Sequence, residues 1–174
     1  MQNSNSAFVV RRCRPHDIAS LSRLLKVCWH ATYDRMLGEH AVQAGRHLHS
    51  KFNLGLWIAR SILSRDCTVL VATRDGRPVG HAMAQRDGAE IILYSLYVHP
   101  EWQGKGIGSA LLAAVIAGHP EAKAIRLEVL KDNAAAIAWY QTKGFESYGG
   151  TENATGAAGV ASAYMDKKLI AHTP

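Results

Sequence analysis

Three glycines at alternate positions, Gly104, Gly106 and Gly108, carry the clearest chemical signal in the sequence. They lie between a run rich in Ile, Leu, Tyr and Val that ends at Val98 and a stretch with helical spacing that begins at Ile107. Glycines at such a turn leave the backbone N–H groups open to a ligand, and the helix N-terminus adds partial positive charge. The segment therefore predicts a site that binds phosphate.

Two well-known phosphate-binding patterns do not fit this segment. A P-loop requires Gly-Lys-Ser/Thr four residues after a glycine, and no such run follows. A dinucleotide fingerprint would use Glu128, 20 residues after Gly108, as the acid that binds ribose. However, Ser109 stands where that pattern needs glycine, and Glu128 falls inside a predicted strand, followed by Val129. Both patterns are therefore set aside.

Two blocks of the sequence resemble the GNAT superfamily of acetyl-CoA-dependent N-acetyltransferases. The first is Arg/Gln-x-x-Gly-x-Gly/Ala at a helix start, found here as Gln103, Gly106 and Gly108, after Leu96-x-Val98-x-Pro100. The second contains an Asn, an Ala, an aromatic-Tyr pair and a Gly-Phe pair, found here as Asn133, Ala136, Trp139-Tyr140 and Gly144-Phe145. The resemblance is specific from Leu96 to Phe145 and topological from Phe8 to Leu169.

The resemblance implies a cofactor site and a general acid. Backbone amides of one continuous segment would hold the pyrophosphate of acetyl-CoA: Gln103, Gly104, Lys105, Gly106, Ile107, Gly108 and Ser109. Leu96 and Val98 would offer backbone groups to the acetyl carbonyl and the pantetheine arm, and Asn133 would reach the pantetheine. Tyr140 matches the residue that protonates the leaving thiolate, a role that suits a phenol with a pKa near 10. This chemistry requires no metal.

Simpler structural interpretations remain open for several of these residues. Tyr140 could pack in the core beside Trp139, Asn133 could serve only as a helix cap, and Lys105 could be an ordinary solvated side chain. Trp29 and Tyr33, near the predicted end of the first helix, match the place where family members hold the acceptor, but they could equally belong to the core.

The general base is the least determined part of the site. Protein-lysine acetyltransferases of this superfamily carry a Glu six residues before the position of Val98, where this chain has Ile92. Glu90, two residues earlier on the same strand face, is the predicted substitute, with Tyr94 or a chain of waters as alternatives and an exposed structural carboxylate as the simpler interpretation. The departure favours a small amine over an internal lysine.

The elements that must position these residues follow from hydrophobic periodicity. Strands are predicted at 8–12, 68–72, 78–84, 90–98, 124–130, 145–148 and 163–169, and helices at 15–29, 52–63, 107–116 and 134–140. Turn dipeptides separate the three central strands, and residues 149–163 read as a loop. The order β-α-α-β-β-β-α-β-α-β-β predicts an α/β fold with a single mixed, mostly antiparallel, twisted sheet and helices on both faces.

Composition narrows the class of protein. With 174 residues, 48% of them hydrophobic, and a net charge of +6, the chain is expected to form a single domain over 1–174, with its cofactor-binding core at about 90–148. No stretch is long and apolar enough for a membrane helix, and no secretory signal is apparent, so a cytoplasmic protein is expected. The scattered basic residues match no nucleic-acid-binding motif, so nucleic acid is not an expected partner.

Two groups of potential metal ligands or redox residues are also present. His40, His47 and His49 lack a cysteine or carboxylate at ligand spacing, so no metal site is expected. Cys13, Cys28 and Cys67 are an odd number and lie far apart, so they are expected to be buried free thiols.

The sequence therefore predicts an N-acetyltransferase that moves the acetyl group of acetyl-CoA to a primary amine of a small molecule, by direct attack in a ternary complex. One alternative is an enzyme that acts on protein N-termini, which would need an open groove. The others are a CoA-binding module without turnover and a nucleic-acid-binding protein. The resemblance also implies a homodimer.

Overall fold

The computed structural model describes residues 8–38, 51–152 and 160–169. Its strands are β1 (Val9–Arg12), β2 (Cys67–Arg74), β3 (Arg77–Asp87), β4 (Glu90–Val98), β5 (Ala124–Leu130), β6 (Glu146–Thr151) and β7 (Ser162–Lys168). Its helices are α1 (Ile18–Leu37), α4 (Lys51–Leu63), α5 (Ile107–Ala117) and α6 (Ala134–Thr142), with short 3-10 turns at Pro15–Asp17 and Pro100–Trp102. The order of strands and helices is the predicted one.

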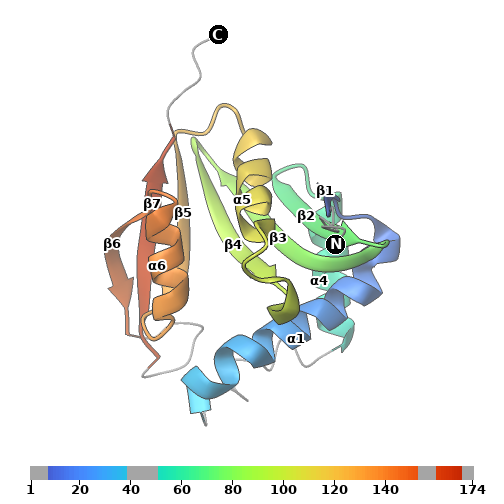
Figure 1. The fold of residues 1–174 in the computed structure, drawn as a ribbon. Helices are drawn as coiled ribbons and strands as arrows, with labels where there is room; N and C mark the ends of the chain where they lie inside the picture. The colour runs from blue at the N-terminus through green and yellow to red at the C-terminus, as the bar shows by residue number, and fades with distance from the viewer. Residues whose placement is uncertain (1–7, 39–50, 153–159, 170–174) are drawn as a thin grey trace, which may run out of the picture.

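The strands form one seven-stranded sheet in the order β1-β2-β3-β4-β5-β7-β6 (Figure 1). All neighbouring pairs are antiparallel except β4 and β5, which are parallel because α5 crosses between them. The predicted fold class, a mixed and mostly antiparallel sheet with helices, is confirmed. None of the helices among the described residues is long and apolar enough to span a membrane.

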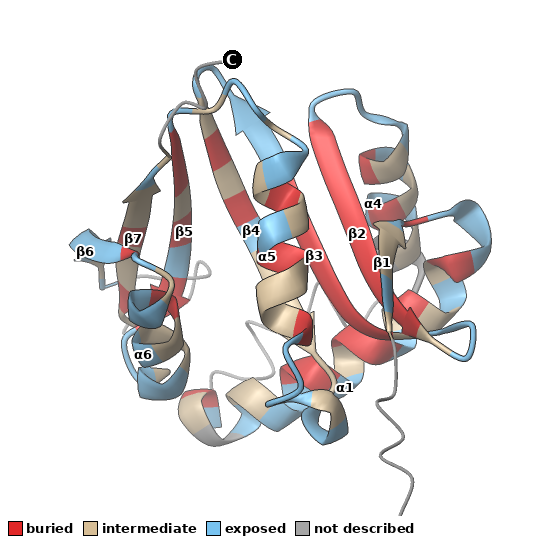
Figure 2. Cartoon of the chain, turned by 45° about the horizontal axis from the view of Figure 1, so that its top comes forward, coloured by how far each residue is buried: buried red, intermediate tan, exposed pale blue. Residues whose placement is uncertain are grey.

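Two hydrophobic clusters, one on each face of the sheet, hold the helices in place (Figure 2). On one face, Leu21 and Leu25 of α1 and Ile58 of α4 pack on Val71 and Met83. On the other face, α5 and α6 cover the larger cluster, in which the α5 residues are Ile107, Leu111, Leu112 and Val115. The candidate site lies in a gap of the sheet that connects these two faces.

This gap is a separation between β4 and β5. The two strands pair only from Glu90 to Leu93 on β4 and from Ala124 to Leu127 on β5, after which they diverge (Figure 1). On its other side β4 keeps its pairing with β3, but the register shifts between Leu93 and Ser95, so Tyr94 is the extra residue of a β-bulge. The second halves of β4 and β5 are therefore not paired with each other.

Several predicted boundaries are wrong: β2 and β3 run to Arg74 and Asp87, past their predicted ends, and the ends of α1 and β6 also differ. α1 continues to Leu37 instead of ending near Tyr33, and it stops at Gly38, which has a φ of 49°. β6 continues to Thr151, so the first residues of the predicted loop belong to a strand. Pairing with β7 explains the extension: Gly150 sits opposite Ala163, so close to the Ser162 carbonyl that no Cβ would fit.

An ion pair fixes the N-terminal corner of the fold. Arg11 of β1 donates two hydrogen bonds to the Asp17 carboxylate, at 2.7 and 2.9 Å, and the backbone N–H of Arg14 donates a third at 2.8 Å. The Arg11 hydrogen bonds, helped by that of Arg14, hold the pKa of Asp17 below its ordinary value even though burial opposes them. This carboxylate ties β1 to the start of α1.

Candidate active site

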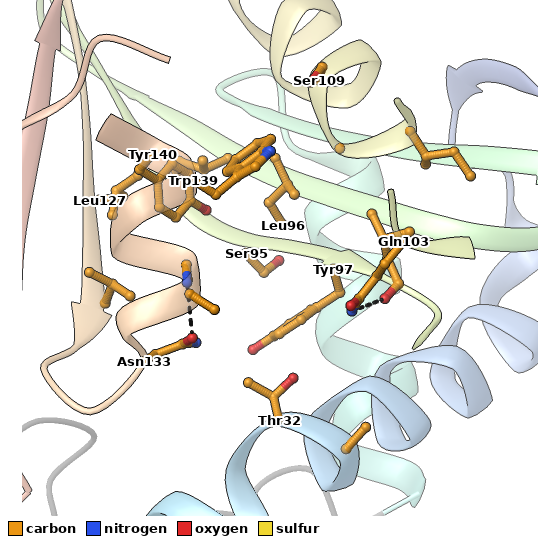
Figure 3. A pocket seen from close by; sticks show the side chains of 18 of the residues that line it. Thr32, Ser95, Leu96, Tyr97, Gln103, Ser109, Leu127, Asn133, Trp139 and Tyr140 are labelled. Atoms are coloured by element: carbon orange, nitrogen blue, oxygen red, sulfur yellow. Dashed lines mark hydrogen bonds between the residues drawn. The ribbon is translucent and has the colours of Figure 1, made fainter. Parts of the chain in front are cut away.

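A cavity of about 670 Å³ occupies the separation between β4 and β5 (Figure 3). Four parts of the chain line it: one turn in the second half of α1, the second half of β4, the glycine segment with the start of α5, and the facing parts of β5 and α6. Because the cavity passes between two strands, it reaches both faces of the sheet.

The glycine segment has the geometry that its spacing predicts. Gly104 and Gly106 have φ angles of 71° and 81°, in the left-handed region that favours glycine. Gly108 is needed for space, because a Cβ there would lie 3.2 Å from Trp139 Cζ2. No side chain caps α5, whose first backbone bond runs from Ala110 N–H to the Gly106 carbonyl, so the N–H groups before it are open to an anion.

Two polar residues of this segment have intramolecular partners. The Gln103 side-chain amide donates to the Val98 carbonyl at 3.2 Å and closes the turn after β4 (Figure 3). The Lys105 ammonium lies 4.3 Å from the Trp102 ring centroid, and Arg74 lies 4.5 Å from the same ring. Lys105 thus lies beside the cavity, outside its lining, while Trp102 and Gln103 belong to the lining.

The second half of β4 directs backbone groups into the cavity. His99 donates its backbone N–H to Val79, on the β3 side. Because the direction of these groups alternates along a strand, the N–H groups of Val98 and Leu96 face the opposite side, toward β5. The pairing between β4 and β5 has already ended there, so these donors have no strand partner.

The phenol of Tyr140 reaches the cavity from α6. Its ring is 9% exposed and packs edge-on against Trp139 and Phe145, at centroid distances of 4.9 and 5.3 Å. Burial, and secondarily the nearby Tyr33 hydroxyl, raises the pKa of Tyr140 above its ordinary value near 10, so the group keeps its proton at neutral pH. Asn133 accepts a hydrogen bond from Ala136 N–H at 3.1 Å, which caps α6, and it also lines the cavity.

The face of the sheet that α1 covers contributes a different set of polar groups to the cavity. Thr32 and Tyr33 line it from α1, Ser95 and Tyr97 from β4, and Glu128 from β5. Glu128 is the one acidic residue among the described residues that line the cavity, and its carboxylate accepts a hydrogen bond from the buried Ser162 hydroxyl at 2.6 Å. The α1 side of the cavity thus combines a carboxylate with the hydroxyl groups of Thr32, Tyr33, Ser95 and Tyr97.

Sequence reasoning missed Glu128 as a site residue, although its neighbours carried a signal. Leu127 and Val129 both belong to the cluster under α5 and α6, so alternation places Glu128 on the opposite face of the sheet. Glu128 is exposed there, and packing of the fold does not require a carboxylate at that position. What the sequence did not show was that β4 leaves β5 before this residue.

Besides Lys105, two other predicted site residues lie away from the cavity lining. Glu90 sits at the start of β4, at the opposite end of that strand from the glycine segment, and its carboxylate pairs with Arg126 at 2.6 Å. Trp29 is 8% exposed and packs with Leu37 and Leu130 in a third hydrophobic cluster. Its ring lies 4.4 Å from that of Tyr33, so Trp29 supports a lining residue instead of lining the cavity itself.

No cysteine is among the described residues that line the cavity, and the three histidines considered as metal ligands cannot be placed relative to it. His40, His47 and His49 lie outside the described residues, and the described part of the chain contains no cluster of three or more His, Cys, Asp or Glu that could hold a metal. Cys13, Cys28 and Cys67 are buried free thiols, as expected.

Comparison with known proteins places this geometry in context. The model of the acetyltransferase (GNAT) family matches residues 24–145. The structure is similar to that of the PaiA N-acetyltransferase from Thermoplasma acidophilum in complex with coenzyme A, with 25% identity, a TM-score of 0.77, and coverage of 94% of this chain and 99% of that one.

Two further solved structures share the fold. The ribosomal-protein-alanine N-acetyltransferase from Brucella melitensis is 24% identical, with a TM-score of 0.73 and coverage of 92% of this chain and 99% of that one. The ribosomal-protein-S18-alanine N-acetyltransferase from Escherichia coli is 18% identical, with a TM-score of 0.70 and coverage of 97% and 99%.

Proposed function

The chain belongs to the acetyltransferase (GNAT) family, and on that basis we propose that it transfers the acetyl group of acetyl-CoA to a primary amine of a small molecule. The observation that carries the proposal is the cavity between β4 and β5, which joins an open helix N-terminus, a protonated phenol and a carboxylate. The two reactants would meet in that cavity, so transfer would be direct and need no acetylated enzyme.

Acetyl-CoA fits the half of the cavity that faces α5 and α6. The uncapped N–H groups at the start of α5 suit its pyrophosphate, and Gly108 lets Trp139 pack against this first turn. The N–H groups of Leu96 and Val98 and the side chain of Asn133 suit an amide-containing arm threaded between the strands. When bound, acetyl-CoA supplies a thioester whose carbonyl carbon accepts the amine.

Backbone donors and Tyr140 would act on the acyl group. The Leu96 N–H is a fixed donor for a carbonyl oxygen that gains negative charge, and one such donor is worth about 3 kcal/mol in the transition state. Tyr140 holds its proton at Oη until the C–S bond breaks, and then gives it to the sulfur. Its raised pKa does not forbid this transfer, because the same exclusion of water disfavours a bare thiolate.

Glu128 would act on the amine. An ammonium group must lose a proton before its nitrogen can attack, and Glu128 offers a carboxylate on the α1 side of the same gap. The ammonium first gives one proton to Glu128, which passes it to solvent. One C–N bond then forms and one C–S bond breaks, with the Tyr140 proton passing to sulfur. The second proton of the nitrogen is released as the amide forms, and it restores the Tyr140 hydroxyl through solvent. Glu90 is the sequence-based alternative for the role of Glu128, but its ion pair with Arg126 gives it a structural one.

Two assays test the proposed function. Isothermal titration calorimetry with acetyl-CoA measures binding, and release of free thiol measures turnover with n-butylamine, 2-phenylethylamine, the tripeptide Ala-Ala-Ala and Nα-acetyl-lysine amide. We expect binding, turnover with the two small amines, and less with the lysine side chain. A preference for the tripeptide would indicate an enzyme for protein N-termini, and binding with no turnover would indicate a binding module; either would contradict the proposal.

A further inference from the structure

A buried histidine touches the acceptor side of the cavity through a serine. His81 lies on β3 with 0% of its surface exposed, and both of its ring nitrogens have partners. Nδ1 is 3.2 Å from the Leu70 carbonyl oxygen, and Nε2 is 3.0 Å from Ser95 Oγ. Ser95 lines the cavity from β4, so His81 has no contact with the cavity except through this hydroxyl.

The chemistry of the partners fixes the direction of both hydrogen bonds. A carbonyl oxygen only accepts, so His81 Nδ1 carries the proton and donates to Leu70. Burial lowers the pKa of His81 to about 4, so the ring is neutral at physiological pH and Nε2 has no proton. Nε2 must therefore accept, and the Ser95 hydroxyl must donate to it.

This arrangement determines what Ser95 can offer to a ligand. A serine has one proton, and that of Ser95 is committed to His81, so its oxygen presents only lone pairs to the cavity. Ser95 lies between Leu96 and Tyr97 on the cavity wall (Figure 3). The Tyr97 hydroxyl beside it is hydrogen-bonded to Tyr33, and burial is the main cause that raises the pKa of both phenols.

The β-bulge on β4 is what brings Ser95 and His81 together. Ile91 and Leu93 face the cluster under α5 and α6, so strict alternation would direct Ser95 to that face as well. Because Tyr94 is an extra residue, the odd-numbered side chains of β4 change to the other face of the sheet after it. Ser95 and Tyr97 therefore face α1, together with His81 and Met83. Ser95 thus shares a face with Glu128, the proposed acceptor of the amine's proton.

We propose that Ser95 binds an N–H group of the acceptor amine through its hydroxyl oxygen, and that His81 is a positioning residue that keeps this oxygen turned to the cavity as an acceptor. The inference rests on the proposed function. With one N–H held by Ser95 and another proton taken by Glu128, the nitrogen lone pair is left free for the acyl carbon. A ligand that offers only carbonyl or ether oxygens would face the lone pairs of the Ser95 oxygen, and their repulsion would disfavour its binding.

The kinetics of two variants test the Ser95 half of the proposal, with the best acceptor among n-butylamine, 2-phenylethylamine and Ala-Ala-Ala as the probe. Ser95→Ala should raise KM for the amine about 10-fold, while Kd for acetyl-CoA stays within about 2-fold. Ser95→Thr, which keeps the hydroxyl, should restore the amine KM. An active wild type with an unchanged KM in Ser95→Ala overturns this inference alone, whereas a wild type that acetylates no amine overturns the proposed function.

The coupling between the two residues tests the role of His81. His81→Leu should raise the amine KM as much as Ser95→Ala does, and the double variant should be no worse than either single one, because one interaction is lost in all three. A merely structural histidine would instead lower the melting temperature and the affinity for acetyl-CoA, with effects that add to those of Ser95→Ala. Additive effects would overturn the positioning role.

A spectroscopic measurement decides the same question without turnover, even if His81→Leu fails to fold. Nitrogen-15 NMR of the histidine-labelled wild type should show one ring protonated at Nδ1 and bare at Nε2 at pH 7, still neutral at pH 5.5. The Nε2 signal of that ring should shift in Ser95→Ala, which identifies it as His81. A ring protonated at Nε2, or no signal that responds to Ser95→Ala, would overturn the proposal.

Discussion

Ser109 allows the phosphate-binding role of the glycine segment to be tested without damage to the fold. It is the third residue of α5, it lines the cavity, and it is partly exposed. A carboxylate in the first turn of a helix is favoured by the helix dipole, by roughly 0.3–1 kcal/mol. Ser109→Asp should therefore leave the unliganded protein at least as stable as before. Substitutions at Gly106 or Gly108 would not, because of the positive φ at the first and the approach of Trp139 at the second.

The same carboxylate should oppose cofactor binding strongly. Two like charges about 5 Å apart, at an effective dielectric constant of about 20, repel each other by about 3 kcal/mol. A pyrophosphate held by the start of α5 would lie at about that distance from the introduced carboxylate, and salt would screen part of the repulsion. We therefore expect the affinity of Ser109→Asp for acetyl-CoA to fall by about 100-fold.

Ser109→Asn is the matched control, because asparagine has the shape of aspartate without its charge. Calorimetric titration with acetyl-CoA should give an asparagine variant within about 3-fold of wild type, and the deficit of the aspartate variant should shrink as NaCl is raised from about 50 to about 300 mM. Thermal unfolding without cofactor should show no loss of stability for the aspartate variant. Equal affinities of the two variants would refute the placement of the pyrophosphate at α5.

Three further outcomes are expected. Tyr140→Phe should lower kcat by about 100-fold at neutral pH with acetyl-CoA affinity preserved, and less at high pH, where a thiolate leaves unaided; an unchanged kcat would return Tyr140 to a packing role. Glu128→Gln should lower kcat/KM most at low pH, where the amine is fully protonated, whereas the control Glu90→Gln should be silent in thiol-release assays; the reverse result would make Glu90 the base. Because the folded-state pKa of Asp17 is lowered, its carboxylate stabilises the protein above about pH 4 and loses that contribution as pH falls further. Asp17→Asn should therefore lower the free energy of unfolding in urea by about 2 kcal/mol at pH 7 and by less near pH 2. An equal loss at both pH values would contradict the role of the Arg11 pair.

Local features of the sequence were sufficient to predict the order of elements and the turn formed by the glycine segment. Turn dipeptides, caps and the change of hydrophobic period act over a few residues, so their effect does not depend on the rest of the fold. The glycine segment belongs to this class, since the positive φ angles of Gly104 and Gly106 are local requirements of the turn itself. Among the boundaries that failed, α1 runs to Leu37 and ends at the positive φ of Gly38, and β6 runs to Thr151 because it pairs with β7.

The acceptor half was decided only by tertiary structure. Strict alternation along β4 predicted that Glu90 shares a face with Ile92, but it could not foresee the bulge at Tyr94, where the pairing of β3 and β4 shifts register. His81 meets Ser95 across 14 residues of sequence, and Ser162 meets Glu128 across 34. Such contacts depend on strand order and register, and on the point at which β4 separates from β5. A one-residue change in register would turn each of these side chains to the opposite face of the sheet, so no local pattern could have specified them.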